Sequence, residues 1–250
     1  MEPGGWKRRL LRTLPSFEEE MALLGDLVPP GGVCVDVGAS YGLYAVALAR
    51  LVGRAGCVHA FEPRPRSRRV LRVVTSLMAP GNVRVHAVAL SDRDGDDVLV
   101  TPQRRWLLPV PGRTFLRSNL DASPGGDRYY AGWEDEFGGA TEQRVAIGRL
   151  DGIVEGRERV GFVKIDVEGT ELRVLRGAAA TIVRDRPPVL CEIEARHTAK
   201  YGRDPDEVPA WFAQRGYTMH TLTLDGLRRC ERVTAEVNNY LFVPDDRSTG

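Results

Sequence analysis

The stretch Val35-Asp36-Val37-Gly38-Ala39-Ser40-Tyr41-Gly42 decides the fold. The apolar run at 33–37 predicts a buried strand, and an apolar-rich helix is expected directly after the stretch. Glycine between them permits a tight turn and lets a ligand approach the backbone. A dinucleotide site would carry G-x-G-x-x-G, but no glycine lies between Gly38 and Gly42. Asp36 could face an ammonium group, which suits a cofactor with an amino-acid moiety. An ordinary strand-to-helix turn explains the motif equally well.

Two further strand ends point to a nucleoside. Phe61-Glu62-Pro63 closes a second predicted strand, and its carboxylate could accept both ribose hydroxyls. A solvated strand end is the alternative for Glu62, but its spacing from Asp36 suits one β-α-β unit and favours a nucleoside cofactor. Ala89-Leu90-Ser91-Asp92 closes the next strand. Its backbone and small side chains could contact adenine, or it could be a simple turn.

Strands and helices alternate along most of the chain, which is typical of a parallel sheet. We therefore predict an α/β fold with a mostly parallel seven-stranded sheet, helices on both faces and a C-terminal antiparallel hairpin that turns at Asp225-Gly226. The predicted strands cover 33–37, 57–61, 83–90, 160–167, 189–193, 217–222 and 239–243, and the predicted helices cover 41–52, 67–77, 170–184 and 206–214.

The predicted organisation is an N-terminal helical segment over 1–32, a main domain over 33–245 and a tail over 246–250. Within the main domain, 97–144 is rich in proline, glycine and polar residues and has no long periodic segment. Such a long segment is usually functional or disordered, and aromatic residues argue against disorder. We expect this insertion to cover or line a pocket. Its aromatic residues are Trp106, Phe115, Tyr129, Tyr130, Trp133 and Phe137.

Composition narrows the function classes. The net charge of +1 leaves no chain-wide basic field for nucleic acid. No apolar segment reaches the length of a membrane helix, and 18–20 is acidic where a leader sequence would need apolar residues. The sequence therefore predicts a cytoplasmic protein without membrane contact. The cysteines lack the spacing of zinc or redox motifs, which favours buried free thiols at Cys34 and Cys191.

The most charged strand end is Lys164-Ile165-Asp166-Val167-Glu168-Gly169-Thr170-Glu171. Alternation places Lys164, Asp166 and Glu168 on one side, where burial without partners would be costly. We therefore expect them at the end of the strand, in the ligand crevice. Glu171 fits equally well as a residue of the first helical turn, where it suits the helix dipole.

More carboxylates follow the next predicted strand. They could bind a hard cation such as magnesium through oxygen ligands, or they could hydrogen-bond substrate hydroxyls. His197 and His86 are candidate bases, although a lone histidine is more often structural. The candidate metal ligands are Asp166, Glu168, Glu192 and Glu194.

These motifs together resemble the FkbM family of methyltransferases. The resemblance runs over 33–243, includes the closing stretch Asn239-Tyr240-Leu241-Phe242-Val243, and is most specific from Lys164 to Glu171. It implies a Rossmann-like class I methyltransferase fold, S-adenosylmethionine as the methyl donor, and O-methylation of a sugar or natural-product small molecule. The cofactor-binding residues are then expected to be Asp36, Gly38, Ser40, Tyr41, Gly42, Glu62, Pro63, Ala89, Leu90, Ser91 and Asp166.

Two features depart from the family. Many members carry Asn-x-Gly where this chain has Ser40-Tyr41-Gly42, and the insertion at 97–144 matches no family pattern. An alcohol acceptor is a poor nucleophile near neutral pH and needs a base or a metal. We predict that Asp166, with Glu192 or His197, orients the acceptor and helps to deprotonate it.

Three alternatives stay open on sequence grounds. A nucleotide-dependent oxidoreductase is one, although the missing G-x-G-x-x-G counts against it. A noncatalytic module that binds the cofactor and a partner protein is the second. The third is a nucleic-acid methyltransferase whose Arg64-Pro65-Arg66-Ser67-Arg68-Arg69 run contacts phosphates, although a solvated helix face is the preferred reading. We expect the partner to be a small-molecule acceptor, which could be glycosylated. The protein could also form homo-oligomers.

Overall fold

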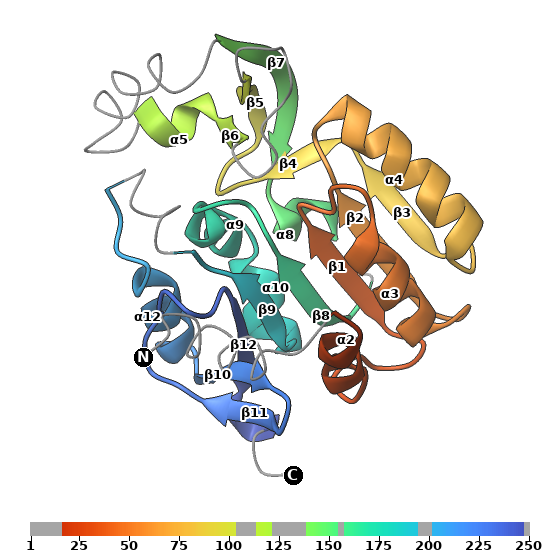
Figure 1. The fold of residues 1–250 in the computed structure, drawn as a ribbon, viewed down its shortest axis with the longest axis vertical. Helices are drawn as coiled ribbons and strands as arrows, with labels where there is room; N and C mark the ends of the chain where they lie inside the picture. Colours follow the sequence, from red (N-terminus) through yellow and green to blue (C-terminus); the bar gives the residue numbers. More distant parts are fainter. Residues whose placement is uncertain (1–16, 104–113, 122–138, 155–157, 195–201, 248–250) are drawn as a thin grey trace, which may run out of the picture.

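The computed structural model describes residues 17–103, 114–121, 139–154, 158–194 and 202–247. Within these residues, eight strands form a main sheet in the order β11-β10-β12-β9-β8-β1-β2-β3 (Figure 1). The strands from β9 to β3 pair in parallel, whereas β12, β10 and β11 pair antiparallel. The predicted α/β class is confirmed. The strands are β1 Val33–Val37, β2 Cys57–Phe61, β3 Val83–His86, β8 Val160–Ile165, β9 Val189–Glu192, β10 Tyr217–Thr223, β11 Gly226–Arg229 and β12 Asn239–Pro244.

The C-terminal hairpin differs from the prediction, and the main sheet has eight strands where seven were expected. Asp225-Gly226 turns β10 into the short strand β11, in which Gly226 pairs with Thr223. β12 then returns between β9 and β10 and is antiparallel to both. The extra strand was missed because β11 is exposed and carries no apolar alternation.

Helices cover both faces of the main sheet. Cys34 and Phe162 pack with α2 and α3, whereas the alternate residues Val35 and Val163 pack with α8, α9, α10 and α12. α4 lies on the same face as α3, against Ala60. The period-2 alternation of strand side chains produces this division. The helices are α2 Phe17–Gly25, α3 Leu43–Val52, α4 Pro65–Met78, α8 Leu150–Ile153, α9 Glu171–Gly177, α10 Ala179–Asp185 and α12 Glu207–Ala213.

The single helix predicted over 170–184 is two helices that meet at Ala178. Gly177 ends the first of them against the backbone of Ser91. A Cβ atom on Gly177 would lie 1.9 Å from the carbonyl oxygen of Ser91, so only glycine allows this approach. α9 is thereby fixed against the chain that leaves β4, Val88–Leu90.

A second sheet, in the order β4-β7-β5-β6, corrects two predictions. The strand expected over 83–90 breaks at Ala87, and its second half leaves the main sheet to pair with β7. The insertion over 97–144 was expected to lack long regular elements, but β5 and β7 pair along nine positions. Figure 1 shows this sheet at the top of the view, opposite the C-terminal hairpin. Its elements are β4 Val88–Leu90, β5 Gly95–Gln103, β6 Phe115–Leu116, α5 Arg117–Asp121 and β7 Gly139–Gly148.

The structure describes only parts of the predicted N-terminal segment, the predicted tail and the insertion over 97–144. α2 lies within the predicted helical segment at 1–32, and the 3-10 helix η1, Asp245–Arg247, crosses the predicted boundary between the main domain and the tail. The proposed domain boundaries stay a prediction. Phe115 is buried in β6. Trp106, Tyr129, Tyr130, Trp133 and Phe137 lie outside the described residues.

Two composition-based predictions can be compared with the structure. Cys34 and Cys191 are free and buried, as predicted. Among the helices of the described ranges, none has both the length and the apolarity that a membrane span requires.

Candidate functional site

The carboxyl ends of β1, β8 and β9 gather charged side chains on the face that α2 and α3 cover. Asp36 lies opposite Lys164 in the sheet register. The backbone N–H of Asp166 donates to the carbonyl of Val37 at 3.0 Å, so the chain after β8 stays beside the end of β1. Parallel strands bring their carboxyl ends to one edge of a sheet, which is where open α/β folds bind ligands.

The turn after β1 is tight because of Gly38. Its φ is +80°, and a Cβ atom there would lie 1.9 Å from the carbonyl oxygen of Asp166. The N–H groups of Gly38 and Ala39 both donate to the carbonyl of Phe61 at 3.0 Å. Glycine therefore lets the β1 turn contact both neighbouring strand ends.

Asp36 is buried and anchors the start of α3. Its carboxylate accepts a hydrogen bond from the N–H of Ala45, in the first turn of that helix. Burial raises the pKa of Asp36 to about 7, although the nearby Lys164 acts in the opposite direction. Oδ2 of Asp36 has no hydrogen-bond partner within the described residues. One acceptor atom of this carboxylate is thus left available inside the cluster.

Lys164 is the positive charge at the centre of this cluster. Its side chain is 1% exposed, and Nζ lies 3.5 Å from Oδ2 of Asp166 and 4.6 Å from the ring centre of Tyr44. Among the described residues, Nζ has no hydrogen-bond partner. A buried ammonium is costly unless carboxylates surround it. Lys164 therefore balances the buried acidic side chains.

Glu20, Tyr44 and Asn239 complete the cluster, and sequence reasoning missed all three. The hydroxyl of Tyr44 donates to Glu20, and Nδ2 of Asn239 donates to the same carboxylate at 3.0 Å. These residues come from α2, α3 and β12. Glu20 and Tyr44 fit their own elements as ordinary residues, so no local signal marks them, and the stretch that resembles the family at Asn239 assigned this residue no role in the site.

Asp166 and Glu192 form a carboxyl pair at the ends of β8 and β9. Their side chains are hydrogen-bonded to each other. Burial, and then the negative charge of Asp166, raises the pKa of Glu192 to about 8. The side chain of Asp166 is 37% exposed. At neutral pH Glu192 therefore keeps its proton, beside an accessible Asp166.

Glu62 is buried at the end of β2 and is held by four hydrogen bonds. The N–H of Ser40 donates to Oε2 at 2.9 Å, and the N–H of Arg64 donates to Oε1 at 2.8 Å. The guanidinium of Arg64 donates to both oxygens, at 3.0 and 3.3 Å. The backbone fixes the carboxylate, and one arginine side chain covers it.

The comparisons with known proteins settle the family. The model of the FkbM methyltransferase domain matches residues 36–219. The chain belongs to the FkbM methyltransferase family. The predicted Rossmann-like class I methyltransferase fold and the resemblance are thereby confirmed. The match covers the motifs at Gly38, Glu62 and Asp166 but ends before β11 and β12.

Individual relatives of this FkbM domain come from bacteria and fungi. The AMB antimetabolite synthetase AmbE of Pseudomonas aeruginosa is 32% identical over 72% of this chain and 9% of its own length. Methyltransferase sdnD of Sordaria araneosa is 29% identical over 60% of this chain and 61% of its own length. The chain thus spans less than two thirds of either relative. The crystal structure of methyltransferase FkbM from Methylobacillus flagellatus KT superposes with a TM-score of 0.48 at 15% identity, over 94% of this chain and 57% of that one.

The residues around Glu62 fit the ribose of S-adenosylmethionine, the donor implied for an FkbM domain. A carboxylate has about four acceptor positions, and two backbone N–H groups occupy only half of them. The guanidinium of Arg64 occupies the remaining two, which are those that ribose hydroxyls would use. Its side chain is 27% exposed, so it can turn toward solvent.

Replacing Arg64 by alanine is expected to tighten S-adenosylmethionine binding by roughly two- to fivefold, the scale of a part-exposed ion pair. The ribose would no longer have to displace the guanidinium, and a positive charge near a sulfonium cofactor would be gone. Calorimetric titration of both proteins measures the change. Arg72→Ala, on the exposed side of α4, is the matched control. Weaker binding in Arg64→Ala alone would mean that the guanidinium assists the cofactor.

The other predicted cofactor residues differ in their environment. Ala89 and Leu90 are buried in β4, and Ser91 is buried against Gly177. Tyr41 is 57% exposed. The remaining residues, Ser40, Gly42 and Pro63, lie in the turns after β1 and β2. Adenine contact by the β4 residues stays a prediction, because β4 has left the main sheet.

The candidate bases and metal ligands are only partly brought together. His197 lies outside the described residues. His86 stacks on Phe61 and hydrogen-bonds to His59 at 3.1 Å, and burial lowers its pKa to about 4, which fits a structural role. Among the described residues, no three Asp, Glu, His or Cys side chains are arranged to hold a metal ion. The magnesium set of Asp166, Glu168, Glu192 and Glu194 is therefore not assembled, since Lys164 is the cation beside Asp166.

The raised pKa of Glu192 gives a pH dependence of stability. The folded state binds this proton more tightly than the unfolded chain, whose carboxyl has a pKa near 4.5. The stabilisation is complete below that value and is lost as the pH rises through about 8. We expect Glu192→Gln to flatten this decline. Part of the decline in stability should remain in this variant, because burial also raises the pKa values of Asp36 and Glu171 to about 7.

The measurement is urea unfolding of wild type and Glu192→Gln at about pH 5.5 and about pH 8.5. Most of the titration of Glu192 in the folded protein takes place between these two values. Glu194→Gln, two residues further along, is the control. An identical loss of stability in wild type and Glu192→Gln would contradict the proton on Glu192.

Proposed function

We propose that this FkbM domain transfers the methyl group of S-adenosylmethionine to a hydroxyl group of a sugar or a natural-product small molecule. One observation carries the proposal: an accessible Asp166 is paired with Glu192 beside the buried Lys164, next to the turn at Gly38. An alcohol needs a proton acceptor as it attacks, and this pair supplies one.

Each residue of the cluster has a distinct part. When bound, S-adenosylmethionine supplies an electrophilic methyl group. Glu62 would hold the ribose, and the backbone at Gly38 would allow close approach. Asp166 accepts a hydrogen bond from the acceptor hydroxyl and takes its proton, while protonated Glu192 hydrogen-bonds to Asp166. The ammonium of Lys164 lies 3.5 Å from Oδ2 of Asp166 and holds that side chain in place through the ion pair.

The relatives support a natural-product acceptor. One is an antimetabolite synthetase and the other is a methyltransferase. The nearly balanced charge of the chain favours a small acceptor over a nucleic acid. A free or a glycosylated small molecule would suit the proposed chemistry.

The test is a panel of acceptors incubated with the protein and S-adenosylmethionine. Sugars and hydroxylated small molecules are compared with amines, carboxylic acids, RNA and DNA, with and without a chelator of divalent metals. Formation of S-adenosylhomocysteine and a methyl ether, detected by mass spectrometry, supports the proposal. Methylation of nitrogen, of a carboxylate or of nucleic acid overturns it. Tight cofactor binding without turnover on any acceptor would identify a noncatalytic module.

A further inference from the structure

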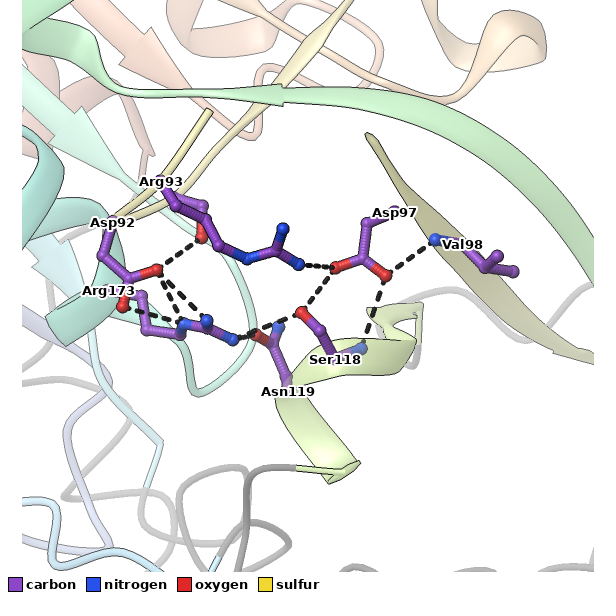
Figure 2. Close-up of polar contacts among 8 residues, drawn as sticks. Asp92, Arg93, Asp97, Val98, Ser118, Asn119 and Arg173 are labelled. Carbon is purple, nitrogen blue, oxygen red and sulfur yellow. Dashed lines mark hydrogen bonds and ion pairs between the residues drawn. The ribbon is translucent and has the colours of Figure 1, made fainter. Parts of the chain in front are cut away.

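Arg173, in the first turns of α9, joins three separate parts of the chain (Figure 2). Its Nε donates to both carboxylate oxygens of Asp92 at 3.2 Å, and its Nη2 lies 3.1 Å from Oδ1. Its Nη1 donates to Oγ of Ser118 at 3.4 Å and to Oδ1 of Asn119. The side chain is only 11% exposed. One nearly buried guanidinium thus links α9 to the end of β4 and to α5.

Asp97 on β5 holds the same segment from the other side. Its Oδ1 accepts from the N–H of Ser118 at 3.4 Å and from the N–H of Val98 at 2.7 Å. Its Oδ2 accepts from the hydroxyl of Ser118 and from Arg93 at 3.3 Å. Figure 2 shows Ser118 and Asn119 lying between Arg173 and Asp97. We call residues 115–121, which form β6 and α5, the β6–α5 segment.

The β6–α5 segment depends on these contacts for its position. A strand of two residues and a helix of five are too short to be stable alone. Phe115 and Leu116 are buried and pair with β5, and Leu116 belongs to the small core of the second sheet. The polar link to α9 comes from Arg173. Buried guanidinium pairs of this kind fix geometry, since each bond has a set direction.

α9 is rigidly joined to the loop that carries Asp166. Its first residue, Glu171, accepts a hydrogen bond from the N–H of Gly169 at 2.8 Å, and Thr170 donates to the carbonyl of Val167 at 3.2 Å. Arg173 follows two residues later. The β6–α5 segment is therefore set in place relative to Asp166 through a short run of hydrogen-bonded residues.

We propose that Arg173 is a positioning residue that holds the β6–α5 segment as a wall of the acceptor site. Its substitution changes the binding of a hydroxylated acceptor much more than the binding of the methyl donor. The inference rests on the proposed function. It also explains why a polar guanidinium is nearly buried where α9 meets the end of β4 and α5.

The first experiment measures the anchoring without any acceptor. Hydrogen exchange at the amides of Ser118 and Asn119 is compared in wild type, Arg173→Ala and Arg173→Lys. The control is Arg176→Ala, an exposed arginine of the same helix. Exchange at these amides should accelerate by about tenfold or more in Arg173→Ala, less in Arg173→Lys, and not in the control. Unchanged exchange in Arg173→Ala overturns the proposal.

The second experiment uses the panel member that the wild type methylates best. Arg173→Ala should raise KM for that acceptor by about tenfold, with the Kd of S-adenosylmethionine within about twofold of wild type, because a small misplacement of a binding wall is costly. Arg173→Lys should recover part of the loss. Equal losses for donor and acceptor, or a lower Tm with unchanged KM, would reduce Arg173 to a structural residue and overturn the inference.

Failure of the proposed function is distinguishable from failure of this inference. A wild type that methylates no member of the panel fails the proposed function and, with it, the acceptor role of the β6–α5 segment. The exchange measurement still decides whether Arg173 anchors that segment.

Discussion

Replacing Asp166 by asparagine is expected to lower turnover by about 10²- to 10⁴-fold, the range for loss of a positioned proton acceptor. Asparagine keeps the shape of the side chain but cannot take a proton from the acceptor. Lys164, 3.5 Å away, would lose its nearest carboxylate, while the amide oxygen could still accept a hydrogen bond from the protonated Glu192. The Kd of S-adenosylmethionine should change little, because the amide can still hydrogen-bond.

Single-turnover kinetics and calorimetric titration separate the two effects. Asp246→Asn is the control, since Asp246 is 66% exposed and pairs only with Arg186 among the described ion pairs. A thermal unfolding curve shows whether Asp166→Asn stays folded. Turnover at the wild-type rate would remove Asp166 from the chemistry and leave His197 as the predicted base.

Replacing Glu62 by glutamine is expected to weaken S-adenosylmethionine binding by about 100-fold. This is the scale expected when two charge-assisted hydrogen bonds to the ribose hydroxyls are lost and the glutamine amide replaces them only in part. The N–H groups of Ser40 and Arg64 point at the two carboxylate oxygens. A glutamine amide would set an NH₂ group against one of these donors. The side chain would then turn away or leave a buried donor without an acceptor.

Calorimetry and the KM of the donor both measure this loss, and kcat at saturating donor should fall much less. Glu158→Gln is the matched control, because Glu158 also pairs with an arginine but lies at the β3 edge, bonded to His59 and Arg84. If Glu62→Gln bound the donor as tightly as wild type, the ribose assignment would be wrong.

The sequence by itself determined the framework and the motifs at the strand ends. Nearly continuous apolar runs placed β1, β2, β8 and β9, because a parallel strand with helices on both sides buries both of its faces. The glycine at Gly38 and the carboxylates Glu62, Asp166 and Glu192 were identified from their positions after strands. The charged run from Lys164 to Glu171 also predicted a ligand crevice at the end of the strand, since such charges are rarely buried without partners.

Only the tertiary structure decided which partners those residues meet. Glu20, Tyr44 and Asn239 join the Lys164 cluster from elements far apart in the chain. The switch of β4 into a second sheet depends on pairing with β7, where Ala89 lies opposite Ile147, 58 positions later in the chain. The link from Arg173 to the β6–α5 segment likewise joins residues more than 50 positions apart. Local patterns report the burial of a side chain but not its neighbours, because those depend on long-range packing.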